Sequence, residues 1–95
     1  MTIARITTIE WNSEETCDAR EQDYVNNAPK EFPDASQLLF VRLNETTVMA
    51  VTLYPDEQTM QKADEARAKR LSIDESSRVS IDTKVGTITL NHQKS

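Results

Sequence analysis

Length, composition and charge already exclude several classes of protein. The chain has 95 residues, one cysteine, and 16 acidic against 11 basic side chains, so its formal net charge is -5. We therefore expect a single cytoplasmic domain over residues 1–95, with no intrachain disulfide. The acidic balance predicts no basic face for nucleic acid. We also expect neither a signal peptide nor a membrane-spanning segment.

The first predicted elements are a strand over residues 3–11 and a helix that ends at about residue 27. Ile and Thr are enriched in IARITTIEW, which favours a strand with apolar positions on both faces. Asn12 or Ser13 is the predicted N-cap of the helix, because acidic side chains follow in its first turn. Helical spacing predicts an inward stripe of Cys17, Tyr24, Val25 and Ala28. Two prolines then predict a loop in which Phe32 anchors the core.

Two further strands and a second helix follow. Residues 37–43 and 47–54 hold the apolar runs LLFV and VMAV, and the short polar segment 44–46 predicts a tight antiparallel connection. A helix opens at Pro55 or Asp56 and is expected to run to about residue 71. Its predicted inner stripe is Met60, Ala63, Ala66 and Leu71.

The last predicted strand changes its apolar face near its end. Apolar side chains stand at odd positions up to Val85 but at even positions from Ile88. The only glycine, Gly86, lies between them. Because an extra residue reverses the pleat of a strand, we expect a β-bulge at Val85 to Thr87.

The element order predicts a ferredoxin-like α+β fold. A βαββαβ chain forms a four-stranded antiparallel sheet with both helices on one face. The runs LLFV and VMAV are apolar on both sides of their strands, so the face without helices also needs a cover. A second copy of the chain is the simplest cover, which predicts a homodimer through the sheet face.

The chain resembles the antibiotic biosynthesis monooxygenase-like family of the dimeric α/β-barrel superfamily. The resemblance rests on the length, the passage VMAVTLYPDEQTM, the helix end DEARAKRL and the final strand VGTITLNH. It implies two ferredoxin-like units packed sheet to sheet, with a pocket in each subunit between sheet and helices. It also implies relatives that include cofactor-free monooxygenases of phenolic polyketides, haem-degrading proteins and isomerases. The Trp and His of better-known members correspond here to Tyr54 and a position near Ala63.

Three aromatic side chains are candidate pocket walls. Trp11 could wall a flat cavity, and Tyr24 and Tyr54 could orient a phenolic or carbonyl group. Each is also explained as a half-buried side chain with its polar tip in water.

Three other residues carry possible chemistry, each with a structural alternative. Arg42 interrupts an apolar strand and could bind an anionic ligand, join a partner subunit or reach solvent. His92, the only histidine, could shuttle a proton at a pocket mouth or be a solvated terminal residue. Cys17 is interpreted as a small buried apolar residue. One histidine and one distant cysteine give no support for a metal or haem site, so no cofactor is expected.

Two functions follow from these observations. The first is a cofactor-free, monooxygenase-like dimer that binds a small apolar or aromatic molecule between sheet and helices. The second is a non-catalytic ligand-binding, regulatory or structural dimer whose pocket is filled by its own side chains. The catalytic base, if there is one, is not identified by the sequence.

Overall fold

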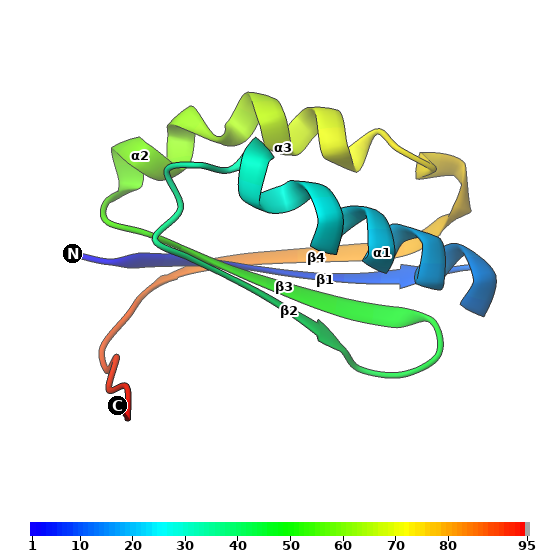
Figure 1. The fold of residues 1–95 in the computed structure, drawn as a ribbon, viewed down its shortest axis with the longest axis horizontal. Helices are drawn as coiled ribbons and strands as arrows, with labels where there is room; N and C mark the ends of the chain where they lie inside the picture. The colour runs from blue at the N-terminus through cyan, green and yellow to red at the C-terminus, as the bar shows by residue number, and fades with distance from the viewer. Residues whose placement is uncertain (95) are drawn as a thin grey trace.

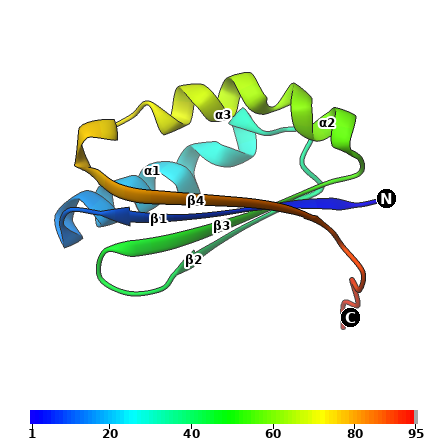
Figure 2. The same ribbon diagram turned by 180° about the vertical axis from the view of Figure 1, so that it is seen from behind.

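A computed structural model describes residues 1–94 and has the ferredoxin-like fold that the sequence predicts. One antiparallel sheet has the strand order β2-β3-β1-β4, and the helices lie on one of its faces (Figures 1 and 2). No helix within residues 1–94 combines the length and apolarity that a membrane crossing requires. The elements are β1 Ile3–Trp11, α1 Glu14–Glu31, β2 Gln37–Arg42, β3 Thr47–Tyr54, α2 Glu57–Lys62, α3 Asp64–Leu71, a 3-10 turn Glu75–Ser77 and β4 Arg78–Thr87.

The register of β1 decides which side chains meet the helices. In the pairing of β1 with β3, Ile3 lies opposite Tyr54. In the pairing of β1 with β4, Ile3 lies opposite Thr87. Directly paired residues share a face, and successive residues alternate between faces. The odd-numbered residues of β1 therefore point towards the helices together with the even-numbered residues of β3.

Helix α1 begins as predicted but runs further than expected. Of the two predicted caps, Ser13 is the one used, and its hydroxyl accepts a hydrogen bond from the Thr16 amide at 3.1 Å. The predicted end at about residue 27 is wrong, because the helix continues to Glu31 with Pro29 inside it. Val25 was also wrongly placed inward and is 61% exposed, since Tyr24 on the adjacent helical position takes the inward direction.

The second helical region is divided rather than continuous. Helix α2 begins after Asp56, whose carboxylate accepts a hydrogen bond from the Thr59 amide at 2.7 Å. It ends at Lys62, and α3 begins at Asp64 after the single residue Ala63. Met60 is buried as predicted, and α3 has no buried residue.

The predicted bulge around Gly86 is wrong. Gly86 pairs directly with Ala4, its φ is not positive, and β4 ends at Thr87. Ile88 and Leu90 lie beyond the strand. The shift of apolar residues from odd to even positions therefore marks the end of the strand. The irregularity in this pairing lies instead between Glu10 and Trp11.

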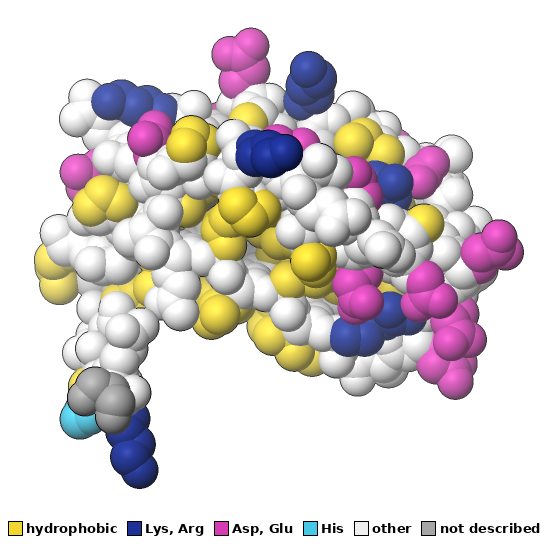
Figure 3. Space-filling model, in the orientation of Figure 1, with side chains coloured by type: hydrophobic (Ala, Val, Ile, Leu, Met, Phe, Trp, Pro, Cys, Tyr) yellow, Lys and Arg dark blue, Asp and Glu magenta, His cyan; other side chains and the backbone are white. Residues whose placement is uncertain are grey.

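The face of the sheet opposite the helices is apolar along its inner strands. Ile6, Met49 and Val51 lie on it by register, and Leu39 and Val41 on the edge strand β2 are 45% and 44% exposed. Apolar side chains reach the surface below the helices, over β2 and β3 (Figure 3).

Candidate functional site

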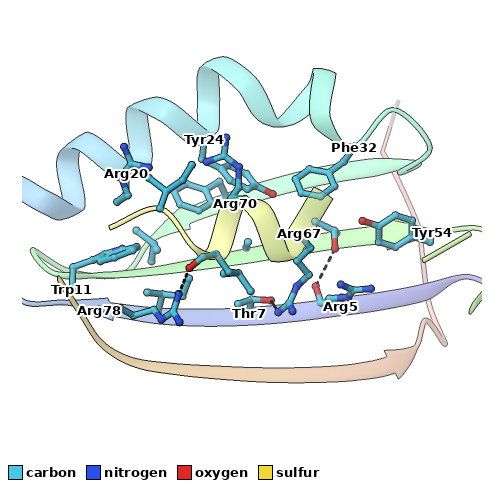
Figure 4. A pocket seen from close by; sticks show the side chains of 17 residues that line it. Arg5, Thr7, Trp11, Arg20, Tyr24, Phe32, Tyr54, Arg67, Arg70 and Arg78 are labelled. Atoms are coloured by element: carbon cyan, nitrogen blue, oxygen red, sulfur yellow. Dashed lines mark hydrogen bonds between the residues drawn. The ribbon is translucent and has the colours of Figure 1, made fainter. Parts of the chain in front are cut away.

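A cavity of about 80 Å³ lies between the sheet and the helices (Figure 4). Its floor is formed by the helix-facing side chains of β1 and β3, and its roof comes from α1 and α3. The β1 lining runs from Arg5 to Trp11, six steps along the strand, which at about 3.3 Å per step is roughly 20 Å. The space is therefore long and narrow. Its lining residues are Arg5, Thr7, Ile9, Trp11, Arg20, Tyr24, Phe32, Phe40, Val48, Ala50, Thr52, Tyr54, Arg67, Arg70, Leu71, Ile73 and Arg78.

The structure brings three of the five predicted pocket residues together in this lining. Trp11 stands at one end and Tyr54 at the other, with Tyr24 between them (Figure 4). The Tyr24 ring stacks on Phe40 with centroids 4.4 Å apart. Burial raises the pKa of Tyr24 to about 12, so its hydroxyl is neutral at physiological pH. The aromatic walls therefore add no negative charge to the cavity.

Arginine is the other dominant residue of the lining. Five of the six arginines of the chain line the cavity, whereas none of its five lysines does. No aspartate or glutamate is among the lining residues. In a chain with a net charge of -5, this concentration of guanidinium groups around one enclosed space is the main electrostatic feature of the molecule.

Carboxylates behind the lining neutralise the arginines under α1. Arg70 donates to Glu31 at 2.8 Å and to Asp23 at 3.1 Å, and its guanidinium lies 5.5 Å from the centre of the Tyr24 ring. Burial by itself would raise the pKa of Asp23, but the hydrogen bond and charge of Arg70, the hydrogen bond from Asn27 and the charge of Arg20 together outweigh it, and the pKa is lowered. Arg20 also pairs with Asp23, at 2.9 Å.

The arginines near β4 are held differently. Arg5 is 5% exposed, and it donates to the Met60 carbonyl at 3.1 Å and to Asp64 at 2.7 Å. Arg67 has only hydroxyl partners, Thr7 at 3.1 Å and Thr83 at 2.9 Å. Burial and the nearby charge of Arg5 lower the pKa of Arg67. Arg67 is thus a partly buried cation for which no carboxylate partner occurs within residues 1–94.

Two buried nitrogens of the lining make no hydrogen bond within residues 1–94, Arg20 Nε and the indole nitrogen of Trp11, but Arg20 Nε lies 3.0 Å from the Asp74 carboxylate. The Trp11 side chain is 5% exposed, and its indole nitrogen makes no hydrogen bond to any residue of the described chain. A buried donor of this kind costs about 1–3 kcal/mol while unsatisfied. An acceptor oxygen placed beside it would remove that cost.

The other two predicted pocket residues lie outside the cavity lining. Arg42 donates to the Asn44 and Glu45 carbonyls, both at 2.6 Å, and lies 2.9 Å from Asp18, so it ties the β2–β3 connection to α1. His92 follows β4 in the exposed tail (Figure 3). Cys17 is fully buried against Trp11 and Val48, and burial raises the pKa of its thiol.

The sequence interpretation missed the arginine lining. Basic residues were considered only as part of the surface charge. The arginines come together in space through contacts between distant parts of the chain, such as that of Arg5 with Asp64, 59 positions apart. One signal was available in the sequence. Arg5 and Trp11 both stand at odd positions of the first strand, so their side chains had to point to the same face of the sheet.

Among residues 1–94, no group of three or more His, Cys, Asp or Glu side chains is placed to hold a metal ion.

Comparison with known proteins identifies the fold. A dimeric ferredoxin-like protein from an uncultured marine organism superposes with a TM-score of 0.76 at 13% identity, over 99% of this chain and 93% of that one. SnoaB, a cofactor-independent oxygenase from Streptomyces nogalater, gives 0.75 at 7% identity, over 98% of both chains. A candidate antibiotic biosynthesis monooxygenase from Chloroflexus aurantiacus gives 0.78 at 7% identity, over 98% of both chains.

These similarities confirm, at the level of the fold, the resemblance to antibiotic biosynthesis monooxygenase-like proteins. No family model and no curated protein sequence matches the chain.

Proposed function

We propose that this protein binds a small planar anion, an aromatic carboxylate or phenolate, between its sheet and its helices. The observation that carries the proposal is the lining: five arginines, five aromatic rings and no acidic side chain surround one enclosed space. Guanidinium groups recognise carboxylates and phenolates through charge-assisted hydrogen bonds and also stack on aromatic faces. A ligand with both a ring and a negative charge uses both properties.

The volume limits the size of the ligand. Sites for drug-sized molecules usually enclose about 300–1,000 Å³, and this cavity is about 80 Å³. A single ring with a short acidic substituent is therefore the preferred class. A fused polycyclic molecule requires side chains of the lining to move.

A homodimer through the sheet face is the proposed assembly. Leu39 and Val41 expose apolar surface on the face without helices, and burial of such surface is the main driving force for association. The dimeric ferredoxin-like protein of the same fold supports this assembly.

A cofactor-free oxidation is the proposed activity if the protein is an enzyme. SnoaB, which shares the fold, is a cofactor-independent oxygenase. Arginines around a phenol would lower its pKa and favour the phenolate, the form that O2 oxidises more readily. The measurement is O2 consumption with hydroquinone, a single-ring phenol, which should exceed the spontaneous rate and be lost when the cavity is filled.

The alternative is a dimer whose cavity is filled by its own side chains and has no ligand. The small volume of the cavity favours this alternative. It predicts that no small aromatic acid binds under any condition.

One titration separates the two functions. Trp11 is the only tryptophan and lines the cavity, so its fluorescence reports on occupancy. Benzoate should change that fluorescence in a saturable manner. Ala50→Leu, which fills the cavity from β3, should abolish the change, while Met49→Leu on the opposite face of the same strand should retain it. No saturable change in the wild-type protein, up to the solubility limit of benzoate, would favour the filled dimer.

A further inference from the structure

An open groove lies beside the cavity, on the flank of the molecule formed by α2, α3 and β4. Its volume is about 430 Å³. It is lined by Arg5, Met60, Gln61, Asp64, Arg67, Ala68, Leu71, Thr83 and Val85. Three of these residues, Arg5, Arg67 and Leu71, also line the cavity. The groove and the cavity are thus adjacent spaces with a common wall.

Arg67 spans this common wall. Its Nη2 atom donates to Thr7, which lines the cavity, and to Thr83, which lines the groove. Thr7 and Thr83 are directly opposite each other in the β1–β4 pair. In Figure 4 the Arg67 side chain descends from α3 to β1, beside Arg5. The guanidinium in this wall is therefore held by hydrogen bonds to two hydroxyl groups, one on each side.

The partners of Arg67 set it apart from its neighbours. Arg5, Arg20 and Arg70 each have a carboxylate within 3.1 Å, and Arg78 donates to the Leu71 carbonyl at 2.7 Å. Arg67 alone borders both the cavity and the groove with only hydroxyl partners. A carboxylate adds the attraction of opposite charges, and often a second parallel hydrogen bond, to what a hydroxyl partner gives a guanidinium. An anion that reaches Arg67 would therefore replace two uncharged partners with a charged one. Arg5 is paired with Asp64, which also lines the groove, so Arg67 supplies the net positive charge at this place.

We propose that the groove and the cavity form one site for a small aromatic acid, and that Arg67 receives its carboxylate. This inference rests on the proposed function and adds the access route and the residue that selects for charge. The acid reaches Arg67 from the groove, replaces the hydroxyls of Thr7 and Thr83, and moves the guanidinium away from the wall. The ring then passes into the aromatic part of the cavity, towards Tyr24.

The groove suits this role because it combines charge with apolar surface. Met60, Leu71 and Val85 provide contacts for a ring while the acid group is held by Arg67. Val85 is 54% exposed, although it faces the helix layer opposite Arg5. The helices thus leave this side of β4 open, which gives the ligand a path from solvent.

The test compares benzoate with benzamide, a neutral molecule of nearly the same shape. Both are titrated into the wild-type protein and into Arg67→Gln, with Trp11 fluorescence as the signal. We expect the wild-type protein to prefer benzoate. Arg67→Gln should weaken benzoate binding by about 10- to 100-fold, the range for loss of a charge-assisted hydrogen bond, and leave benzamide binding unchanged. Arg67→Lys should recover part of the preference, because it restores the charge but not the two-pronged geometry.

A second pair of variants tests the access route. Thr83→Val removes the groove-side hydroxyl that holds Arg67, so benzoate should associate faster in stopped-flow measurements. Thr8→Val is the matched control, because Thr8 lies on the opposite face of β1 and should leave the rate unchanged.

The outcomes separate this inference from the proposed function. If the wild-type protein binds benzoate and Arg67→Gln leaves the ratio of benzoate to benzamide affinity unchanged, the inference is overturned and the proposed function stands. An equal loss of both affinities in Arg67→Gln makes Arg67 a purely structural residue and also overturns the inference. Absence of benzoate binding to the wild-type protein overturns both.

Discussion

The two faces of the sheet carry opposite kinds of surface although they belong to the same strands. The helix-facing side of β1 presents Arg5 and Thr7, and the guanidinium of Arg5 is almost fully buried. The opposite side presents Ile6 between Val51 and Lys84, so it is apolar on the inner strands and charged at the edge strand β4. A buried arginine needs acceptors, whereas an exposed aliphatic patch needs an apolar cover. This difference is the reason that we propose a small aromatic anion for one face and a second copy of the chain for the other.

The largest expected effect comes from placing a charge on the apolar face. Val51→Asp should dissociate the dimer, because a carboxylate there has no partner in either sheet. Light scattering should give about twice 10.8 kDa for the wild-type protein and about 10.8 kDa for the variant. Ser80→Asp is the control on the same face, at the polar edge strand β4, and should remain a dimer. A wild-type monomer would contradict the proposed assembly.

A smaller effect is expected when the ion-pair network on the other face is broken. Arg70→Met removes the partner of Glu31 and one partner of Asp23, and should lower the free energy of unfolding by about 1–3 kcal/mol. Urea denaturation measures the loss. Lys69→Met, a neighbouring exposed position on α3, is the control and should change little. Equal stabilities of the two variants would mean that the network contributes no stability.

The same variant should alter the response to acid. The pKa of Asp23 is lowered in the folded protein, so its ion pairs stabilise the fold above the ordinary value of 3.8 and are lost as the pH falls below it. Arg70→Met should therefore lose less stability on acidification than the wild-type protein does.

The aromatic wall predicts an effect confined to high pH. The pKa of Tyr24 is raised to about 12 from 10.0, so unfolding is favoured as the pH rises through this window, where the unfolded chain releases the proton first. Tyr24→Phe should remove the tyrosinate absorbance change at about pH 12 and reduce the loss of stability between pH 10 and 12. Absorbance at alkaline pH measures the first effect. A tyrosinate signal near pH 12 that persists in Tyr24→Phe would contradict this assignment.

The smallest effect is expected at Arg42, which lies on the helix-facing side of the edge strand β2 but outside the cavity lining. Its partners are Asp18, Glu21 and the carbonyls of the β2–β3 connection. Exposed ion pairs contribute little. Arg42→Gln should therefore leave dimer mass and benzoate affinity unchanged, with little change in melting temperature. A large loss of benzoate affinity would restore Arg42 as a ligand-binding residue.

The sequence predicted the fold well because its signals are local. Strand β3, which contains the apolar run VMAV, has its predicted bounds, Thr47–Tyr54, since Pro55 follows directly and ends the strand. The bounds of α1 were less well predicted, because a proline near the end of a helix is tolerated when the last turn closes around it. Here the Phe32 amide donates to the Ala28 carbonyl at 2.9 Å.

The site was only partly predictable because it depends on distant contacts. Trp11, Tyr24 and Tyr54 were selected as large rings that a pocket would require, and each lines the cavity. Arg42 was preferred to Arg67 because it interrupts an apolar strand. A helical arginine such as Arg67 looks like a solvated residue until the packing of α3 over β1 places it beside Thr7.

The most direct test of the contrast between the two faces is the side-chain nitrogen NMR spectrum of the arginines with and without benzoate. The account predicts that the Nε–H signal of Arg67 moves most, that those of Arg5 and Arg70 move less, and that the signal of Arg42 stays in place. Equal displacement of Arg42 and Arg67, or no displacement of any arginine signal, would contradict an anion site on the helix-facing side of the sheet.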